Sequence, residues 1–312
     1  MDIRQLRYFQ AIHEHGSLLG ASRRLHVATT ALSYHLGRLE EELGQRLFER
    51  RPRGLTPTAA GERLHDHATA ILRAVDHAVA DIRQGGKEIS GVVRVGMAYS
   101  AVKAIGIALA KRMMADHPRV QLSLNESLSG ATLSTLLRNE VDLALIYNPQ
   151  TDPRIKAEPL LIERMGCVGM ASLIGETGTP ITVEELMTLP IIMLQQGVSS
   201  GMVLDEVEIL KRIESRAVLK MNSVQAISGA LREQLGCSIS SRLSVSEAVA
   251  DGTLSFRPII EPSLSRTLCL CVLADTPQTY VLETVRSILC ELIRDAIENG
   301  RWDAQLVAPE AR

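Results

Sequence analysis

Short apolar runs alternate with helical patterns through most of this 312-residue chain, and this alternation constrains the fold more than any other feature. Strands separated by helices of about 10–15 residues are typical of βαβ units with parallel sheets. The runs fall into two clusters, which predict an α/β region with two lobes: lobe I at about 91–162 and 268–300, and lobe II at about 163–267. The expected strands are 92–97, 120–125, 143–147, 165–170, 189–194, 217–221, 237–240 and 268–273, and the expected helices are 101–116, 131–139, 202–214, 223–234 and 277–299.

Residues 1–57 follow a different pattern, made mainly of short helices. Asp2 can cap a helix whose apolar positions recur every three residues, and Gly16 ends it. Ser17 can cap a second short helix, and a third is expected at about Thr29 to Leu43. Two short helices with a brief connection, the second carrying polar side chains outward, predict a helix-turn-helix.

Residues 47–83 extend this region. Leu47 and Leu55 flank a turn rich in Arg, Pro and Gly, as in a small β-hairpin. Thr56-Pro57 predicts the start of a helix that runs to about Arg83, because proline is favoured at the first helical position. A single apolar stripe on so long a helix predicts pairing with a second copy, so residues 58–90 are assigned as a dimerising linker helix and hinge. The stripe consists of Leu64, Ala68, Ile71, Leu72, Val75 and Val79.

Charge is distributed unevenly along the chain. Residues 1–60 contain nine Arg and six acidic residues, a net charge of about +3, whereas the whole chain has a net charge of −2. A basic amino-terminal part on an acidic remainder is typical of proteins that bind nucleic acid through one domain. Apolar residues make up 46% of the chain, which is enough for buried cores and excludes disorder for most of it.

Cysteine spacing and hydropathy indicate the compartment. Five cysteines without a Cys-x-x-Cys pair fit reduced thiols in a cytosolic protein. Cys269 and Cys271 alternate in one apolar run, which favours buried strand positions over a redox pair. The charged start is unlike a secretory signal, and no apolar run approaches the ~18 residues that span a membrane. We therefore expect a soluble cytoplasmic protein without membrane contact.

Several short motifs occur in a fixed order: LRYF at 6–9, HGS at 15–17, ALS at 31–33, RLEEELG at 38–44, LFER at 47–50 and LTPTAAG at 55–61. Two more follow in the body, GVVRVG at 91–96 and VDLALIY at 141–147. In order and spacing these motifs resemble the LysR-type transcriptional regulators, and within them the nitrogen-assimilation control group. The resemblance covers nearly the whole chain.

The resemblance implies a winged helix-turn-helix, a long linker helix that dimerises, and a two-lobed α/β effector domain like periplasmic binding proteins. It implies a sequence-specific regulator that binds double-stranded promoter DNA as a homodimer or homotetramer. It also implies that a small-molecule effector, bound between the lobes, modulates this binding. We expect no cofactor, no metal and no enzymatic activity.

We expect DNA contacts from the third helix and from the hairpin, or wing: Thr29, Thr30, Ser33, Tyr34, Arg38, Arg51 and Arg53. A recognition helix places its first residues against base edges, while basic residues hold phosphates. Residues 28–30 read Ala-Thr-Thr where the family usually has Ser-Gln-Pro or similar. Because Gln commonly reads adenine edges, base contacts do not transfer from the family. The alternative interpretation is that the two wing Arg are solvated loop charges and that Tyr34 fills space.

Effector contacts are expected where strands end and helices begin, because ligands of open α/β sheets bind beyond the carboxyl ends of strands. Ser100 and Ser129 follow two strands of lobe I, at helix starts that favour an anion. Gln196 and Ser223 precede helices of lobe II, and Tyr147 lies at the crossover between lobes. These five residues predict a site for a small anionic effector. The alternative for each Ser is a helix cap.

Two other classes of function remain open. One is a ligand-binding or enzymatic α/β protein whose amino-terminal helices only mediate association; the other is a redox-switched regulator that uses Cys269 or Cys271. The sequence contains no P-loop, G-x-G-x-x-G or H-E-x-x-H motif, which disfavours the classes of catalysis that depend on them. His65-x-His67 could suggest a metal-binding pair, but residues two apart do not face each other on a helix. We therefore interpret these residues as part of a solvated helix face.

DNA affinity is expected to fall steeply with salt, with a log–log slope on the order of −5 or steeper if a dimer neutralises six or more phosphates. Arg51→Ala with Arg53→Ala should weaken binding to all sequences and flatten that slope, whereas Thr29 or Ser33 variants should change which sequence is preferred. The measurement is a gel shift over a range of salt concentrations. An unchanged slope in the double Arg variant would show that the wing is not part of the DNA interface.

Overall fold

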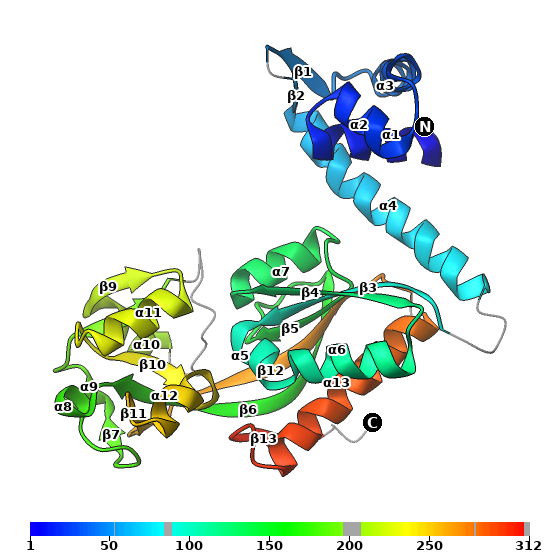
Figure 1. Cartoon of the computed structure of the whole chain (residues 1–312). Coiled ribbons are helices and arrows are strands. Elements are labelled where there is room, and N and C mark those ends of the chain that lie inside the picture. Colours follow the sequence, from blue (N-terminus) through cyan, green and yellow to red (C-terminus); the bar gives the residue numbers. More distant parts are fainter. Residues whose placement is uncertain (53, 84–88, 196–206, 278, 309–312) are drawn as a thin grey trace. The chain divides into compact units, whose positions relative to one another are not determined.

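The computed structural model describes residues 1–52, 54–83, 89–195, 207–277 and 279–308. The chain forms two compact units, which Figure 1 shows in sequence colours. One comprises Met1–Lys87 with Arg138–Glu140, and the other comprises Glu88–Leu137 with Val141–Arg312. Each unit has its own buried core and is described separately.

The amino-terminal unit begins with three helices, α1 (Ile3–His15), α2 (Leu18–Leu25) and α3 (Thr29–Leu43). Their ends follow the predicted capping residues. The Asp2 carboxylate accepts a hydrogen bond from the Gln5 amide, Ser17 Oγ accepts one from the Gly20 amide, and Gly16 ends α1 with a left-handed backbone. The helix-turn-helix prediction is confirmed.

The predicted wing is an antiparallel hairpin of β1 (Phe48–Arg51) and β2 (Gly54–Pro57). The Leu55 amide donates a 2.7 Å hydrogen bond to the Gly16 carbonyl, which ties the wing to the end of α1. The linker helix α4 spans Ala59–Arg83. Its cap differs from the predicted Thr56-Pro57: Pro57 ends β2, and Thr58 Oγ accepts the hydrogen bond from the Gly61 amide.

The apolar stripe of α4 is divided between two environments, which corrects the expectation that all of it is available for pairing with a second copy. Ala68 and Leu72 are buried in the core of this unit with Phe9 and Phe48, and Leu64 packs against that core. Ile71 and Val79 are 37% and 41% exposed. The first half of the stripe therefore anchors the helix to the winged domain, and the exposed positions remain for another partner.

The carboxyl-terminal unit has two lobes (Figure 1). In lobe I, three parallel strands in the order β4-β3-β5 pack against α13, α7 and a helical segment whose first part contains a π-turn at Val102–Gly106. The elements of lobe I are β3 (Gly91–Ala98), α5 (Tyr99–Ala101), α6 (Ile107–Asp116), β4 (Val120–Ser127), α7 (Ser129–Leu137), β5 (Leu143–Tyr147), α13 (Tyr280–Glu298) and β13 (Ala304–Leu306).

Lobe II lies in sequence between β5 and the last strands of lobe I. Its elements are α8 (Ala171–Ile174), β7 (Ile181–Thr182), α9 (Val183–Leu186), β8 (Ile191–Leu194), α10 (Val207–Ser215), β9 (Ala217–Met221), α11 (Val224–Arg232), β10 (Ser238–Ser241), α12 (Ser246–Ala250) and β11 (Ser255–Ile260). Strands β8 and β9 are parallel, as predicted.

Two long antiparallel strands, β6 (Ile155–Gly169) and β12 (Ser265–Leu273), connect the lobes. In lobe I, β12 pairs with β5; in lobe II, β6 pairs with β10 and β11. All these pairings are antiparallel, so the predicted parallel strands of each lobe are accompanied by antiparallel strands in mixed sheets. Among the described residues the sheet order is β4-β3-β5-β12-β6-β11-β7, with β10 and β13 also on β6.

The sequence interpretation missed the first half of β6, and β7, β11 and β13 altogether.

In the described part of the chain, no helix is long and apolar enough to cross a membrane.

Candidate functional site

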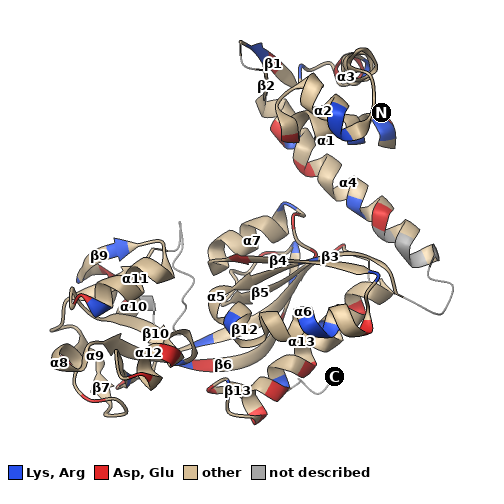
Figure 2. Ribbon diagram, in the orientation of Figure 1, with Lys and Arg blue, Asp and Glu red and all other residues tan. Residues whose placement is uncertain are grey.

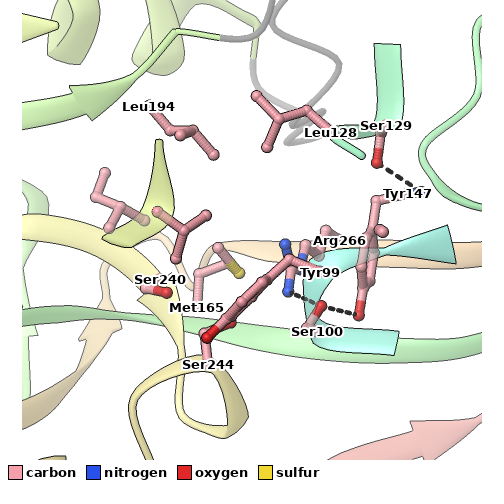
Figure 3. Close-up of a pocket in the computed structure, with 13 residues that line it drawn as sticks. Tyr99, Ser100, Leu128, Ser129, Tyr147, Met165, Leu194, Ser240, Ser244 and Arg266 are labelled. Atoms are coloured by element: carbon pink, nitrogen blue, oxygen red, sulfur yellow. Dashed lines mark hydrogen bonds between the residues drawn. The ribbon is translucent and has the colours of Figure 1, made fainter. Parts of the chain in front are cut away.

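A pocket lies where β3, β5, β6 and β12 approach the start of α11 (Figure 3). The space between its lining residues, counted with the open solvent at its mouth, is about 470 Å³. Both lobes contribute to it. The lining residues are Ala98, Tyr99, Ser100, Leu128, Ser129, Tyr147, Met165, Leu194, Val224, Ile239, Ser240, Ser244 and Arg266.

Arg266, at the start of β12, organises the polar side of the pocket. Its guanidinium lies 3.6 Å from the centre of the Tyr147 ring. Its Nη2 donates hydrogen bonds to Ser100 Oγ at 3.0 Å and to Ser241 Oγ at 3.1 Å. Ser100 Oγ in turn donates to the Tyr147 hydroxyl at 2.9 Å. Arg266 therefore joins residues of lobe I and lobe II in one hydrogen-bonded group, part of which Figure 3 shows.

Glu163, on the neighbouring strand β6, balances the charge of Arg266. The two residues are directly opposite in the β6–β12 register, and Glu163 Oε2 lies 2.6 Å from Arg266 Nη2 and 2.8 Å from Nε. The other carboxylate oxygen accepts a 2.9 Å hydrogen bond from Trp302 Nε1. The side chains of Glu163 and Arg266 are 1% and 12% exposed, so the pair is largely removed from water.

Burial and charge fix the protonation states at this centre. Burial acts to lower the pKa of Arg266, but the Glu163 carboxylate more than offsets it and holds that pKa above its ordinary value. Burial raises the pKa of Tyr147 far above its ordinary value, against the opposing charge of Arg266. The guanidinium is therefore charged and the phenol neutral at physiological pH.

Ser100 and Ser129 both line the pocket and are buried, as the effector prediction requires. Their hydroxyls are used differently. The proton of Ser100 is committed to Tyr147, so this residue acts on the pocket by holding Tyr147 and Arg266. Ser129 Oγ accepts a 3.1 Å hydrogen bond from the Tyr147 amide, and its own proton is available for a bound molecule. The expectation of two free hydroxyls is therefore corrected to one.

The other three residues predicted to contact the effector differ in their positions. Tyr147 is buried and lines the pocket at the end of β5. Ser223 is exposed, and its hydroxyl caps α11 by accepting a hydrogen bond from the Ala226 amide, which is the alternative role given for each Ser. The neighbouring residue Val224 lines the pocket. Gln196 lies outside the described residues. Arg266 and Glu163 were not predicted, although Arg266 is a lone charge beside an apolar strand run and Glu163-Arg164 interrupts another.

The predicted DNA-contacting residues lie mainly on one face of α3. Thr30, Ser33, Tyr34 and Arg38 are exposed at helical spacing, and Thr29 is half-buried at the start of the helix. Tyr34 is 64% exposed, so it does not fill space within the unit; its ring makes an edge contact with His35. This face is polar and uncovered within its own unit, and the major groove of B-DNA is wide enough to admit an α-helix.

Exposed Arg residues also occur on α2 and on β1 of the wing, where the ribbon is blue in Figure 2. Arg51 is exposed and forms a surface ion pair with Glu49, with 2.6 Å between Nη2 and Oε2. Such pairs contribute little to stability, so Arg51 can exchange Glu49 for a phosphate at small cost. Arg53 lies outside the described residues.

The cysteines and histidines considered above as redox or metal-binding candidates do not form such a site in the described part of the chain. Cys269 and Cys271 are buried on β12, and burial raises their pKa values to about 11 and about 12, which disfavours the reactive thiolate. His65 stacks on His13 at 3.9 Å, and burial lowers its pKa, so its assignment to a solvated face is wrong. Among the described residues no His, Cys, Asp and Glu group is arranged to hold a metal.

The winged helix-turn-helix and the two-lobed pocket together define a DNA-binding regulator with a ligand-binding domain. Residues 3–62 match the model of the bacterial regulatory helix-turn-helix proteins of the lysR family, and residues 86–294 match the LysR substrate binding domain. The chain belongs to the LysR family of transcriptional regulators.

Known proteins of the family resemble the chain over nearly its full length. The nitrogen assimilation regulatory protein nac of Escherichia coli (strain K12) is 30% identical over 314 residues, covering 99% of this chain and 100% of that protein. Full-length OxyR from Pseudomonas aeruginosa has a TM-score of 0.71 at 22% identity, covering 94% of this chain and 95% of that one. CbnR in complex with its target DNA has a TM-score of 0.65 at 20% identity, covering 95% and 100%.

The buried ion pair yields a stability prediction. Arg266→Met leaves the Glu163 carboxylate buried without its partner and should destabilise the chain by about 3–5 kcal/mol. Adding Glu163→Gln to that variant removes the uncompensated charge and should restore much of the loss. Thermal or urea unfolding of both variants tests this. A double variant no more stable than Arg266→Met would show that the pair does not behave as a coupled charge.

Proposed function

We propose that the exposed face of α3 reads base edges and that the wing holds phosphates. The support is the exposure of Thr30, Ser33, Tyr34 and Arg38 at helical spacing on α3, together with the exposed Arg residues of α2 and β1 in the same unit. This arrangement supports sequence-specific binding to promoter DNA, with base contacts for specificity and phosphate contacts for affinity.

We propose that a small anionic effector binds in the inter-lobe pocket and changes DNA binding, without catalysis. The single observation that carries this is the convergence of Ser129, Tyr147 and Arg266 on a pocket that both lobes line. A ligand that bridges two lobes favours the closed arrangement by its greater affinity for it. The lobes also meet at Lys103, whose Nζ lies 3.3 Å from the Ser244 carbonyl and 3.4 Å from Glu247 Oε1.

A metabolite screen tests this function. We expect some small anions to raise the melting temperature of the full chain and to change its gel shift on DNA from its own upstream region. Ser129→Ala should weaken the best compound at least tenfold in calorimetric titration, because a hydrogen bond to a charged group contributes about 1.5–3 kcal/mol. Basal DNA binding should persist.

Ser134→Ala is the matched control, since Ser134 lies on the same helix but is exposed and donates only to the Gly130 carbonyl. Equal loss in both variants, or none in Ser129→Ala, would place the effector site outside this pocket.

We also propose that the exposed part of α4 pairs with α4 of a second copy, giving a homodimer or a homotetramer. Ile71, Val79 and Ile82 are exposed on one helix that is anchored at its other apolar positions. Burying these side chains stabilises association by about 25 cal/mol for each Å² removed from water. Two half-sites on DNA also need two recognition helices.

Ile71→Glu with Val79→Glu should give monomers that bind DNA poorly while the winged domain stays folded. Sedimentation and circular dichroism measure these two properties. Arg63→Glu, an exposed change outside the stripe, is the control and should keep the oligomeric state. A double variant as oligomeric as the parent would move the interface away from α4.

A further inference from the structure

The charge of the pocket is set by one ion pair. Among the described lining residues Arg266 is the only charged side chain. Directly behind it, Glu163 carries the opposite charge at 2.6 Å and is itself buried. A molecule in the pocket therefore meets a cation whose charge is already compensated, and the formal charge of the described centre is zero.

The ion pair also determines which donors remain for a ligand. Arg266 Nε is bound to Glu163, and Nη2 is shared among Glu163, Ser100 and Ser241. Within the described residues Nη1 has no hydrogen-bond partner, and the Tyr147 ring covers one face of the guanidinium. Nη1 is therefore the donor that a ligand oxygen can engage, with the Ser129 hydroxyl as a second donor from lobe I.

The remaining walls limit what else the ligand carries. Leu128, Met165, Leu194, Val224 and Ile239 present apolar surface from both lobes. A second carboxylate placed against these side chains would lose its hydration without a compensating charge, which is strongly unfavourable. A carbonyl oxygen or one carboxylate at Nη1 avoids this cost.

We propose that the Arg266–Glu163 pair makes the pocket selective for ligands with a single carboxylate and an apolar remainder, and that it rejects dianions of the same size. This inference rests on the proposed function of the pocket and specifies its ligand class. Arg266 is the residue that contacts the carboxylate. Glu163 is a positioning residue: it orients the guanidinium, is itself held by a hydrogen bond from Trp302, and cancels the charge that would otherwise attract a dianion.

Three probes of similar size separate the charge states: propionate (one negative charge), malonate (two) and propionamide (none). The full chain is titrated with each at constant ionic strength, and fluorescence of Trp302 is recorded together with the melting temperature. Trp302 is the only tryptophan in the chain and donates to Glu163, so it reports on the ion pair directly. Propionate should give a saturable signal in the millimolar range, with malonate at least tenfold weaker.

Glu163→Gln keeps the shape of the side chain but removes its charge. In this variant malonate should bind at least as tightly as propionate, a reversal of preference that a loss of packing alone would not produce. The double variant Glu163→Gln with Arg266→Gln removes both charges and replaces the single variant in this test if that one unfolds. It should bind propionate and propionamide equally. Leu194→Trp fills the pocket from lobe II and should abolish the propionate-dependent rise in melting temperature, which is the readout for this variant because its second tryptophan contributes its own fluorescence.

The outcomes separate the two proposals. A malonate preference in the unchanged chain, no propionate signal up to the highest concentration used, or an unchanged preference in Glu163→Gln would overturn the charge selectivity. A propionate signal that survives Leu194→Trp would show that carboxylates bind elsewhere, which contradicts the proposed location of the effector site. Loss of the propionate signal in Leu194→Trp together with reversal in Glu163→Gln supports both.

Discussion

The ion pair between Glu163 and Arg266 is the constraint on which the arrangement of the carboxyl-terminal unit depends. It bridges β6 and β12, the two strands that both lobes share, at the point where those strands pass from one lobe to the other. A buried charge is tolerated only when it is paired and hydrogen-bonded, so each partner fixes the other. Ser100 and Ser241 accept hydrogen bonds from Arg266 Nη2, and Trp302 donates one to Glu163, which places residues of both lobes in a defined relation to one pocket.

Local signals in the sequence determine the amino-terminal unit well. The caps at Asp2 and Ser17 and the left-handed glycines at Gly16 and Gly44 are short-range interactions, so the limits of α1, α2 and α3 follow from neighbouring residues. The same reasoning fails at the start of α4. Thr56-Pro57 has the composition of a helix start, but pairing with β1 draws Pro57 into the hairpin, and Thr58 takes the capping role.

Long-range pairing explains what the sequence does not reveal in the lobes. The first half of β6 reads IKAEPLLIE, a mixture of charges and apolar residues that has no strict alternation, and only its pairing with β12 makes it a strand. Ser100, Ser129 and Tyr147 are predictable because they follow strand ends. Arg266 and Glu163 are not, because their partnership depends on the register of two strands from distant parts of the chain.

The insertion of lobe II between two neighbouring strands of lobe I has a consequence for biosynthesis. Strand β5, buried along its whole length in the finished molecule, needs β12 as its partner, and β12 emerges from the ribosome only after all of lobe II. Until then the apolar strand Leu143–Tyr147 presents an open edge, a feature that promotes aggregation of nascent chains. Lobe II can complete its own cores in that interval, and lobe I closes around the pocket last.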